Sequence, residues 1–61
     1  MKKEWHSKLK INDLIVFCDR DANKWNLIGE IEQIKKECVV AKWNQNIINI
    51  PYNDIHARLF Q

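Results

Sequence analysis

Two tryptophans set among basic residues are the side chains best suited to binding a nucleic acid. Trp25 and Trp43 each follow a lysine, and other basic residues lie close by along the chain. An exposed indole ring stacks on a nucleobase with about 1–3 kcal/mol per base, and Lys and Arg side chains neutralise phosphates. We therefore predict weak nucleic-acid binding, to DNA or RNA, through a basic and aromatic surface. The predicted residues are Arg20, Lys24, Trp25, Lys35, Lys36, Lys42 and Trp43.

A pair of aspartates beside the first tryptophan indicates a different ligand. Asp19 and Asp21 flank Arg20. Two carboxylates repel phosphate and attract the cationic side chain of a peptide, and an indole ring binds a cation with about 0.5–2 kcal/mol. The alternative prediction is a protein-interaction module for a basic peptide, methylated or not, or for another protein partner. Its predicted residues are Asp19, Asp21, Trp25, Trp43 and Asn44.

Motifs for catalysis and metal binding are absent from the sequence. Cys18 and Cys38 each lie in an apolar run, which is typical of small reduced core residues, with a disulfide as the alternative. His6 and His56 form no HxxxH pair, and no CxxC is present. No Gly-rich phosphate loop or nucleophile motif occurs. We expect no enzymatic activity, no metal and no cofactor.

The length and charge set the scale of the protein. Sixty-one residues make a single domain, and a net charge of +2 neither requires nor excludes a nucleic-acid partner. The apolar runs are too short to cross a membrane, and the charged N-terminus lacks the apolar stretch of a secretory signal. We expect a cytoplasmic protein with a flexible segment over residues 1–8, from which Trp5 packs back on the core, and one domain over residues 9–61. The initial Met and the absence of a linker composition favour a complete small protein.

The central segment, residues 26–40, could form either a helix or a strand. Its isoleucines recur at every third residue, a spacing that drifts around a helix unless i+4 positions are also apolar. Gly29 would cost about 1 kcal/mol in a helix. One extra residue between Ile31 and Ile34 would instead let both side chains point inward while a strand bends. We predict a bulged strand that reaches a charged hairpin tip at residues 35–37.

The rest of the chain reads as short strands separated by turns. Runs rich in β-branched and aromatic residues predict strands, and Pro51 ends one of them because proline has no ladder donor. Five short strands are too few for a sandwich and suit one partly open barrel. The prediction is an all-β, five-stranded, partly open barrel. Besides the central strand, it has strands at residues 13–19, 37–44, 46–51 and 56–60, and a 3-10 turn near Pro51–Ile55.

These segments resemble a Tudor-type domain of the SH3-like barrel class. The resemblance covers residues 10–55: "GEIEQI" matches the second strand of the family, "KKECVVAKW" its hairpin and third strand, and "NIPYNDI" its closing turn. The C-terminal barrel of retroviral integrases is similar in the same register through "VFCDRDANKW". The resemblance implies an SH3-like barrel that binds a nucleic acid or a peptide.

The sequence departs from the Tudor pattern where that family holds methylated side chains. Such domains surround the cation with three or four aromatic rings. Asp19 stands where one ring is expected, and Lys42 stands at a second position, with Trp43 adjacent to it. Trp25 matches one further wall. The resemblance therefore implies an incomplete aromatic cage.

Overall fold

A single antiparallel sheet accounts for most of the chain. The structure, a computed structural model, describes residues 3–59. Its five strands lie in the order β4-β3-β2-β1-β5, and within this range the outer strands β4 and β5 do not pair with each other. The elements are η1 (Glu4–Lys8), β1 (Leu14–Asp19), β2 (Lys24–Ile34), β3 (Cys38–Trp43), β4 (Asn46–Pro51), η2 (Tyr52–Asp54) and β5 (Ile55–Leu59).

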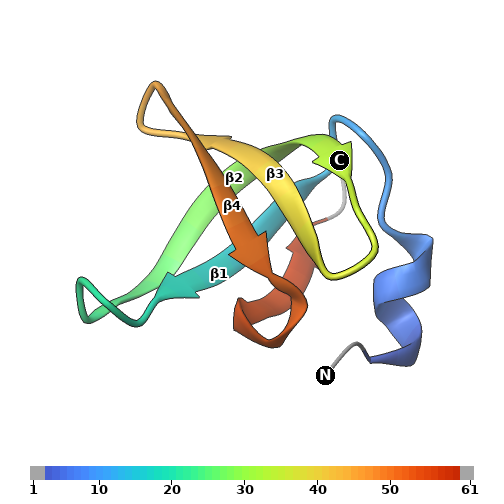
Figure 1. The fold of residues 1–61 in the computed structure, drawn as a ribbon, viewed down its shortest axis with the longest axis horizontal. Helices are drawn as coiled ribbons and strands as arrows, with labels where there is room; N and C mark the ends of the chain where they lie inside the picture. The colour runs from blue at the N-terminus through green and yellow to red at the C-terminus, as the bar shows by residue number, and fades with distance from the viewer. Residues whose placement is uncertain (1–2, 60–61) are drawn as a thin grey trace.

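The sheet rolls up on itself, so that β4 crosses in front of β1 and β2 (Figure 1). β1 to β4 form a meander of neighbouring strands, and η2 then returns the chain so that β5 pairs with β1. The prediction of an all-β, five-stranded, partly open barrel is confirmed, and η2 lies inside the predicted turn at Pro51–Ile55. Phe60, predicted in the last strand, lies outside the described residues.

The long strand β2 contains the bulge that its isoleucine spacing predicts. Ile31 lies opposite Ala41 and Gln33 lies opposite Val40, so Glu32 has no opposing residue on β3. The extra residue reverses the alternation, because side chains on a strand change face at every position. Ile31 is fully buried, and Ile34 returns to the core side of the sheet at the strand end, where it is 40% exposed. A helix over this segment is excluded.

Gly29 lets β2 approach the aromatic centre of the core. A Cβ at this position would lie 3.1 Å from Cε1 of Phe17 and 3.5 Å from Cβ of Ala41. The first distance is tighter than ordinary van der Waals contact, so a larger side chain would push the Phe17 ring aside. The glycine that argues against a helix in the sequence is therefore a packing requirement of the barrel.

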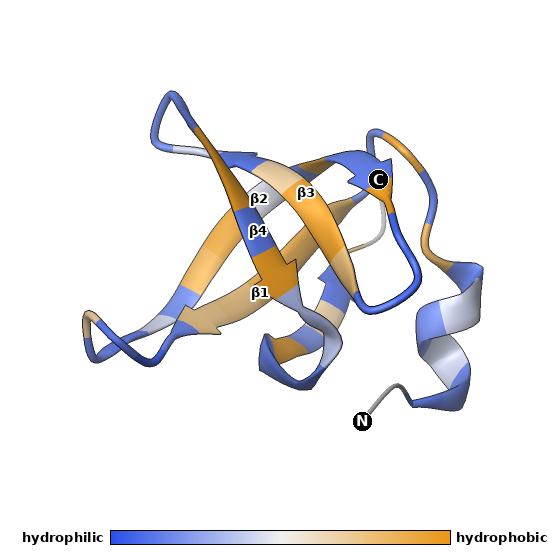
Figure 2. Ribbon diagram, viewed as in Figure 1, coloured by the Kyte–Doolittle hydropathy of each residue, from blue (hydrophilic) through white to orange (hydrophobic). Residues whose placement is uncertain are grey.

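The core lies inside the rolled sheet and draws on every strand. Apolar residues run along the strands and hydrophilic residues gather at the turns (Figure 2). Cys18 is buried, Cys38 is half-buried, and both thiols are free, as predicted. The buried cluster consists of Leu9, Ile15, Phe17, Ile31, Val39, Ala41, Ile50, Tyr52 and Ile55.

The N-terminal segment packs against one end of the barrel. η1 buries His6, whose Nδ1 accepts a hydrogen bond from the backbone N–H of Lys3 at 2.8 Å, while Nε2 lies 3.3 Å from the carbonyl oxygen of Ile55. Trp5 packs on the core, as predicted. The sequence predicts a flexible segment over residues 1–8, but Glu4–Lys8 forms a docked 3-10 helix, and residues 1–2 lie outside the described range.

In the described part of the chain, helical structure is limited to the short 3-10 turns η1 and η2. Within residues 3–59, no helix has the length and apolar character that crossing a bilayer requires.

Candidate functional site

A pocket of about 490 Å³ opens between the β1–β2 turn, β4 and η2. Because β4 and β1 are not neighbours in the sheet, the pocket lies in the gap that the partly open barrel leaves between them. Its apolar wall comes from Phe17, Ile48 and Ile50, which share the core side of the sheet. Its polar wall comes from Asp19, Arg20, Asp21 and Asp54.

The β1–β2 turn holds its charged residues in place through local hydrogen bonds. Oδ1 of Asp19 accepts a hydrogen bond from the backbone N–H of Ala22 at 3.2 Å, and the N–H of Asn23 donates to the carbonyl oxygen of Arg20. Asn23 adopts a φ of 55°, a left-handed conformation that Asn tolerates better than most residues. The turn chemistry visible in the sequence therefore places Asp21 at the pocket.

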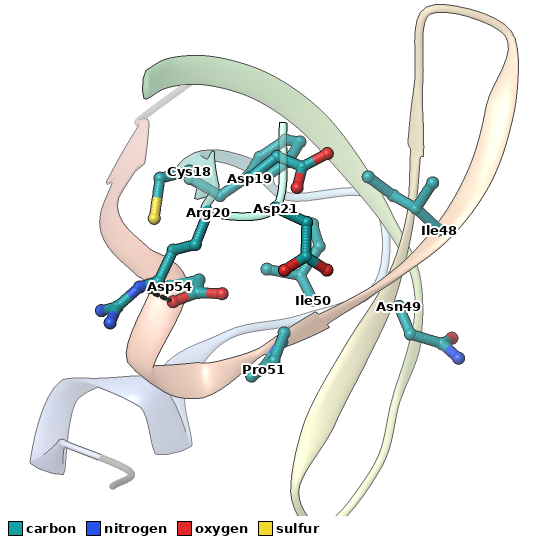
Figure 3. Close-up of a pocket in the computed structure, with 10 residues that line it drawn as sticks. Cys18, Asp19, Arg20, Asp21, Ile48, Asn49, Ile50, Pro51 and Asp54 are labelled. Atoms are coloured by element: carbon teal, nitrogen blue, oxygen red, sulfur yellow. Dashed lines mark ion pairs between the residues drawn. The ribbon is translucent and has the colours of Figure 1, made fainter. Parts of the chain in front are cut away.

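An ion pair joins this turn to η2 across the pocket. Nε of Arg20 lies 2.8 Å from Oδ1 of Asp54 (Figure 3). A hydrogen bond with the Cys18 thiol and the nearby Asp54 carboxylate raise the pKa of Arg20, so its guanidinium stays charged. Asp54 is only 16% exposed at its side chain, whereas Arg20 is mostly exposed. Because solvent screens the exposed guanidinium, the main effect of the pair is to orient the Asp54 carboxylate.

The pocket carries an excess of negative charge. Among the residues that line the pocket, three carboxylates, those of Asp19, Asp21 and Asp54, face one guanidinium. Lys24, which does not line the pocket, lies opposite Asp19 in the β1–β2 ladder and offsets part of this charge. Among residues 3–59, Asp21 makes no hydrogen bond or ion pair, and its carboxyl group points into the space beside Asp54 (Figure 3). Such a site attracts a cation and repels phosphate.

Trp43 lies at the same end of the barrel but is already in contact with other residues. Its ring meets Phe17 edge-on, with centroids 6.3 Å apart, and Nζ of Lys24 lies 5.7 Å from the indole centroid. This lysine occupies the ring face that would receive a base or a ligand cation. Trp43 is therefore a half-buried residue that packs against the core, and it does not line the pocket.

Trp25 lies on the surface and contacts a different partner. Its side chain is 55% exposed and stacks on His56 of β5, with ring centroids 5.8 Å apart and an interplanar angle of 25°. Phe17 lies opposite Ile55 and Val16 lies opposite Ala57, so His56 has no opposing residue on β1. Trp25 and Trp43 therefore do not form a shared platform, although the sequence places both in each predicted site.

The seven predicted nucleic-acid-binding residues do not form one continuous track. Arg20 lies in the β1–β2 turn and Lys24 begins β2, whereas Lys35 and Lys36 lie beyond the other end of this eleven-residue strand. Lys42 lies opposite Glu30, a cross-strand neighbour of opposite charge.

The predicted peptide-binding residues divide in the same way. Asp19 and Asp21 line the pocket, whereas Trp25, Trp43 and Asn44 do not; Asn44 forms the β3–β4 turn with a φ of 50°. Sequence reasoning missed Asp54, Ile48 and Ile50. The only sequence signal for Asp54 was an acidic residue in the predicted 3-10 turn, more than thirty positions from Asp21.

The described part of the chain offers no metal site, because no group of three His, Cys, Asp or Glu side chains in it is placed to hold an ion.

No protein-family model, curated protein or solved structure matches the sequence or the fold. The inference about function therefore rests on the geometry of the pocket.

Proposed function

We propose that this protein is a non-enzymatic binding module that receives an unmodified lysine or arginine side chain of a protein partner in the pocket. The observation that carries the proposal is that Asp19, Asp21 and Asp54 line the pocket beside an apolar wall, with Arg20 as the one cationic residue of the lining. The aliphatic stem of a basic residue packs on an apolar surface while its charged head stays at a polar rim. The pocket offers both surfaces side by side.

The ligand in this proposal is unmethylated. Binding of a methylated cation relies on aromatic faces, because methyl groups remove N–H donors and leave a charge that a ring attracts. The aromatic residue of the pocket is Phe17, which is 1% exposed, and neither tryptophan at this end lines it. Carboxylates accept hydrogen bonds from the N–H donors of unmodified Lys or Arg.

The same proposal includes an SH3-like barrel and a cytoplasmic location. A four-stranded meander, a 3-10 turn and a fifth strand beside the first support the kinship with the SH3-like class. Two free cysteines support a reducing compartment.

Nucleic-acid binding is the second candidate, and the exposed Trp25–His56 stack is the observation in its favour. It predicts that log affinity falls linearly with log salt, with a slope of about −0.9 per contacted phosphate on duplex DNA. Asp21→Asn should strengthen this binding and weaken that of a basic peptide, because it removes one negative charge from the pocket.

An amide-shift titration tests the two candidates with a lysine-rich peptide, single-stranded DNA and duplex DNA as probes. With the peptide, we expect shifts at Asp21, Ile48 and Asp54, and an affinity about 1.4- to fivefold lower for Asp21→Asn, as exposed ion pairs contribute about 0.2–1 kcal/mol. Glu37→Gln is the matched control, because it removes the same charge from a residue of the β2–β3 turn that does not line the pocket. Shifts with DNA and none with the peptide would reject the proposal.

A further inference from the structure

β4 is an edge strand that has little of the usual protection of an edge. It pairs with β3 on one side, and among residues 3–59 no strand pairs with its other side. Natural edge strands carry charged residues, prolines, bulges or covering segments that prevent pairing with another chain, and of these β4 has Pro51 at its end. β4, with the sequence NIINIP, has no charged residue, and its pairing with β3 runs from Asn46 to Pro51 without a register shift.

The register with β3 identifies which backbone groups face this free edge. Asn44 and Gln45, both with positive φ, form a two-residue turn that leaves Trp43 opposite Asn46. Hydrogen-bonded and non-bonded pairs then alternate along the ladder, so Asn46, Ile48 and Ile50 bond to β3. The N–H and C=O groups of Ile47 and Asn49 therefore point away from β3, toward the free edge of the sheet.

The acidic pocket lies against the same edge. Ile48 and Ile50 line the pocket together with Asp21 and Asp54. On a strand added beside β4, side chains opposite Ile48 or Ile50 would face the same side of the sheet and so point to the pocket. The residues between them would point to the outer face, where Ile47 is 59% exposed.

We propose that the partner segment binds as an extra strand on the free edge of β4, antiparallel like every other pair in this sheet. This inference rests on the proposed function and adds the binding mode and the ligand pattern. A lysine or arginine opposite Ile48 enters the pocket, and the apolar residues on either side of it lie opposite Ile47 and Asn49. The ligand is thus an extended segment of the form apolar–basic–apolar.

Charge complementarity selects a foreign segment over a second copy of this chain. Two copies that paired through β4 would bring NIINIP to the pocket, and that strand contains no Lys or Arg to balance the carboxylates of Asp21 and Asp54. Self-pairing would therefore leave the excess negative charge of both pockets in place.

Backbone methylation of a synthetic peptide tests the pairing. The probe is the capped peptide TTVKVTT, in which the amides of the two valines face β4 when the lysine points into the pocket. N-methylation of both valines should lower the affinity about tenfold or more, because it removes hydrogen bonds to Ile47 and Asn49. N-methylation of the lysine amide, which faces away, is the control and should have a smaller effect. Equal affinities of the two methylated peptides, or a larger loss for the lysine-methylated one, would overturn the proposal.

Hydrogen exchange supplies the second readout. Bound TTVKVTT should slow exchange of the Ile47 and Asn49 amides about tenfold or more, with a smaller change at Ile48 and Ile50, which already bond to β3. Unchanged exchange at Ile47 and Asn49, or protection that rises with protein concentration without peptide, would overturn the proposal, the latter in favour of a second copy.

The two levels of the proposal fail in different ways. If Asp21→Asn weakens the binding of TTVKVTT but N-methylation of the valines does not, the pocket function stands and the added strand is rejected. Absence of binding by both TTVKVTT and the lysine-rich peptide rejects the pocket function, and the added strand with it.

Discussion

The two ends of this barrel differ in how their polar side chains are paired. At the end covered by η1, buried His6 has hydrogen-bond partners on both ring nitrogens, and the hydroxyl of Tyr52 donates to the carbonyl oxygen of Lys35 at 2.6 Å. Across residues 3–59, no buried side-chain nitrogen or oxygen is left without a partner. At the open end, Arg20 pairs with Asp54, and among residues 3–59 the carboxylates of Asp19 and Asp21 have no ion pair.

The contrast separates stability from binding. Buried polar groups that are fully paired hold elements together, and losing one partner costs the desolvation of the other. Exposed carboxylates in excess contribute little to folding and stay available to a ligand. Substitutions at the η1 end should therefore change the free energy of unfolding, and substitutions at the open end should change affinity.

The largest effect on stability is expected from His6→Phe. Phenylalanine keeps an aromatic ring beside Trp5 and Tyr52, whose ring centroids lie 4.1 and 5.2 Å from that of His6, but it cannot donate to the carbonyl oxygen of Ile55. We expect a loss of about 1–3 kcal/mol in the free energy of unfolding, measured by urea denaturation. His56→Phe, which replaces an exposed histidine, is the control and should change the free energy of unfolding by less than about 0.5 kcal/mol. Equal losses in the two variants would contradict the contrast between the ends.

Tyr52→Phe should have a smaller effect at neutral pH and a distinct effect at high pH. Loss of the hydrogen bond to Lys35 costs about 1 kcal/mol. Burial, and then the proximity of Cys38, raise the pKa of Tyr52 above its ordinary value of 10.0. The folded state thus resists ionisation of the phenol, so its stabilising contribution is complete below about pH 10 and is lost as pH rises through the folded-state pKa.

Urea denaturation of both proteins at a series of pH values isolates this contribution. Tyr52 is the only tyrosine of the chain, so the phenolate absorbance reports its titration directly. The difference in stability between wild type and Tyr52→Phe should shrink above about pH 10. A constant difference would mean that the phenol does not titrate differently in the folded and unfolded states.

Asp21→Asn should have the smallest effect on stability. It removes a carboxylate that has no partner among residues 3–59, so the free energy of unfolding should change by less than about 0.5 kcal/mol. Asp54→Asn, which breaks the ion pair with Arg20, is the comparison and should lose more stability than Asp21→Asn. A large loss of stability in Asp21→Asn would show that the open end also holds the fold together.

Local patterns in the sequence predicted the strands and the bulge. The spacing of Ile31 and Ile34 required one extra residue for both to face the core, and Glu32 is that residue. The 3-10 helix over Glu4–Lys8 was not predicted, because its few residues have no amphipathic repeat and it is held through His6 by contacts with Tyr52 and Ile55. Half of the pocket was missed for a similar reason: Asp54 and Ile48 reach Asp21 only through the rolling of the sheet.

The sequence by itself determined which segments extend, where they turn and which side chains alternate inward, because these depend on steric rules with a period of two residues. Only the tertiary structure decided that three aspartates line one pocket while the basic residues spread over the barrel, and that Trp43 packs against the core while Trp25 stays on the surface. The curvature that closes a barrel is the sum of many small twists and one bulge, and no short stretch of sequence records where distant side chains then meet.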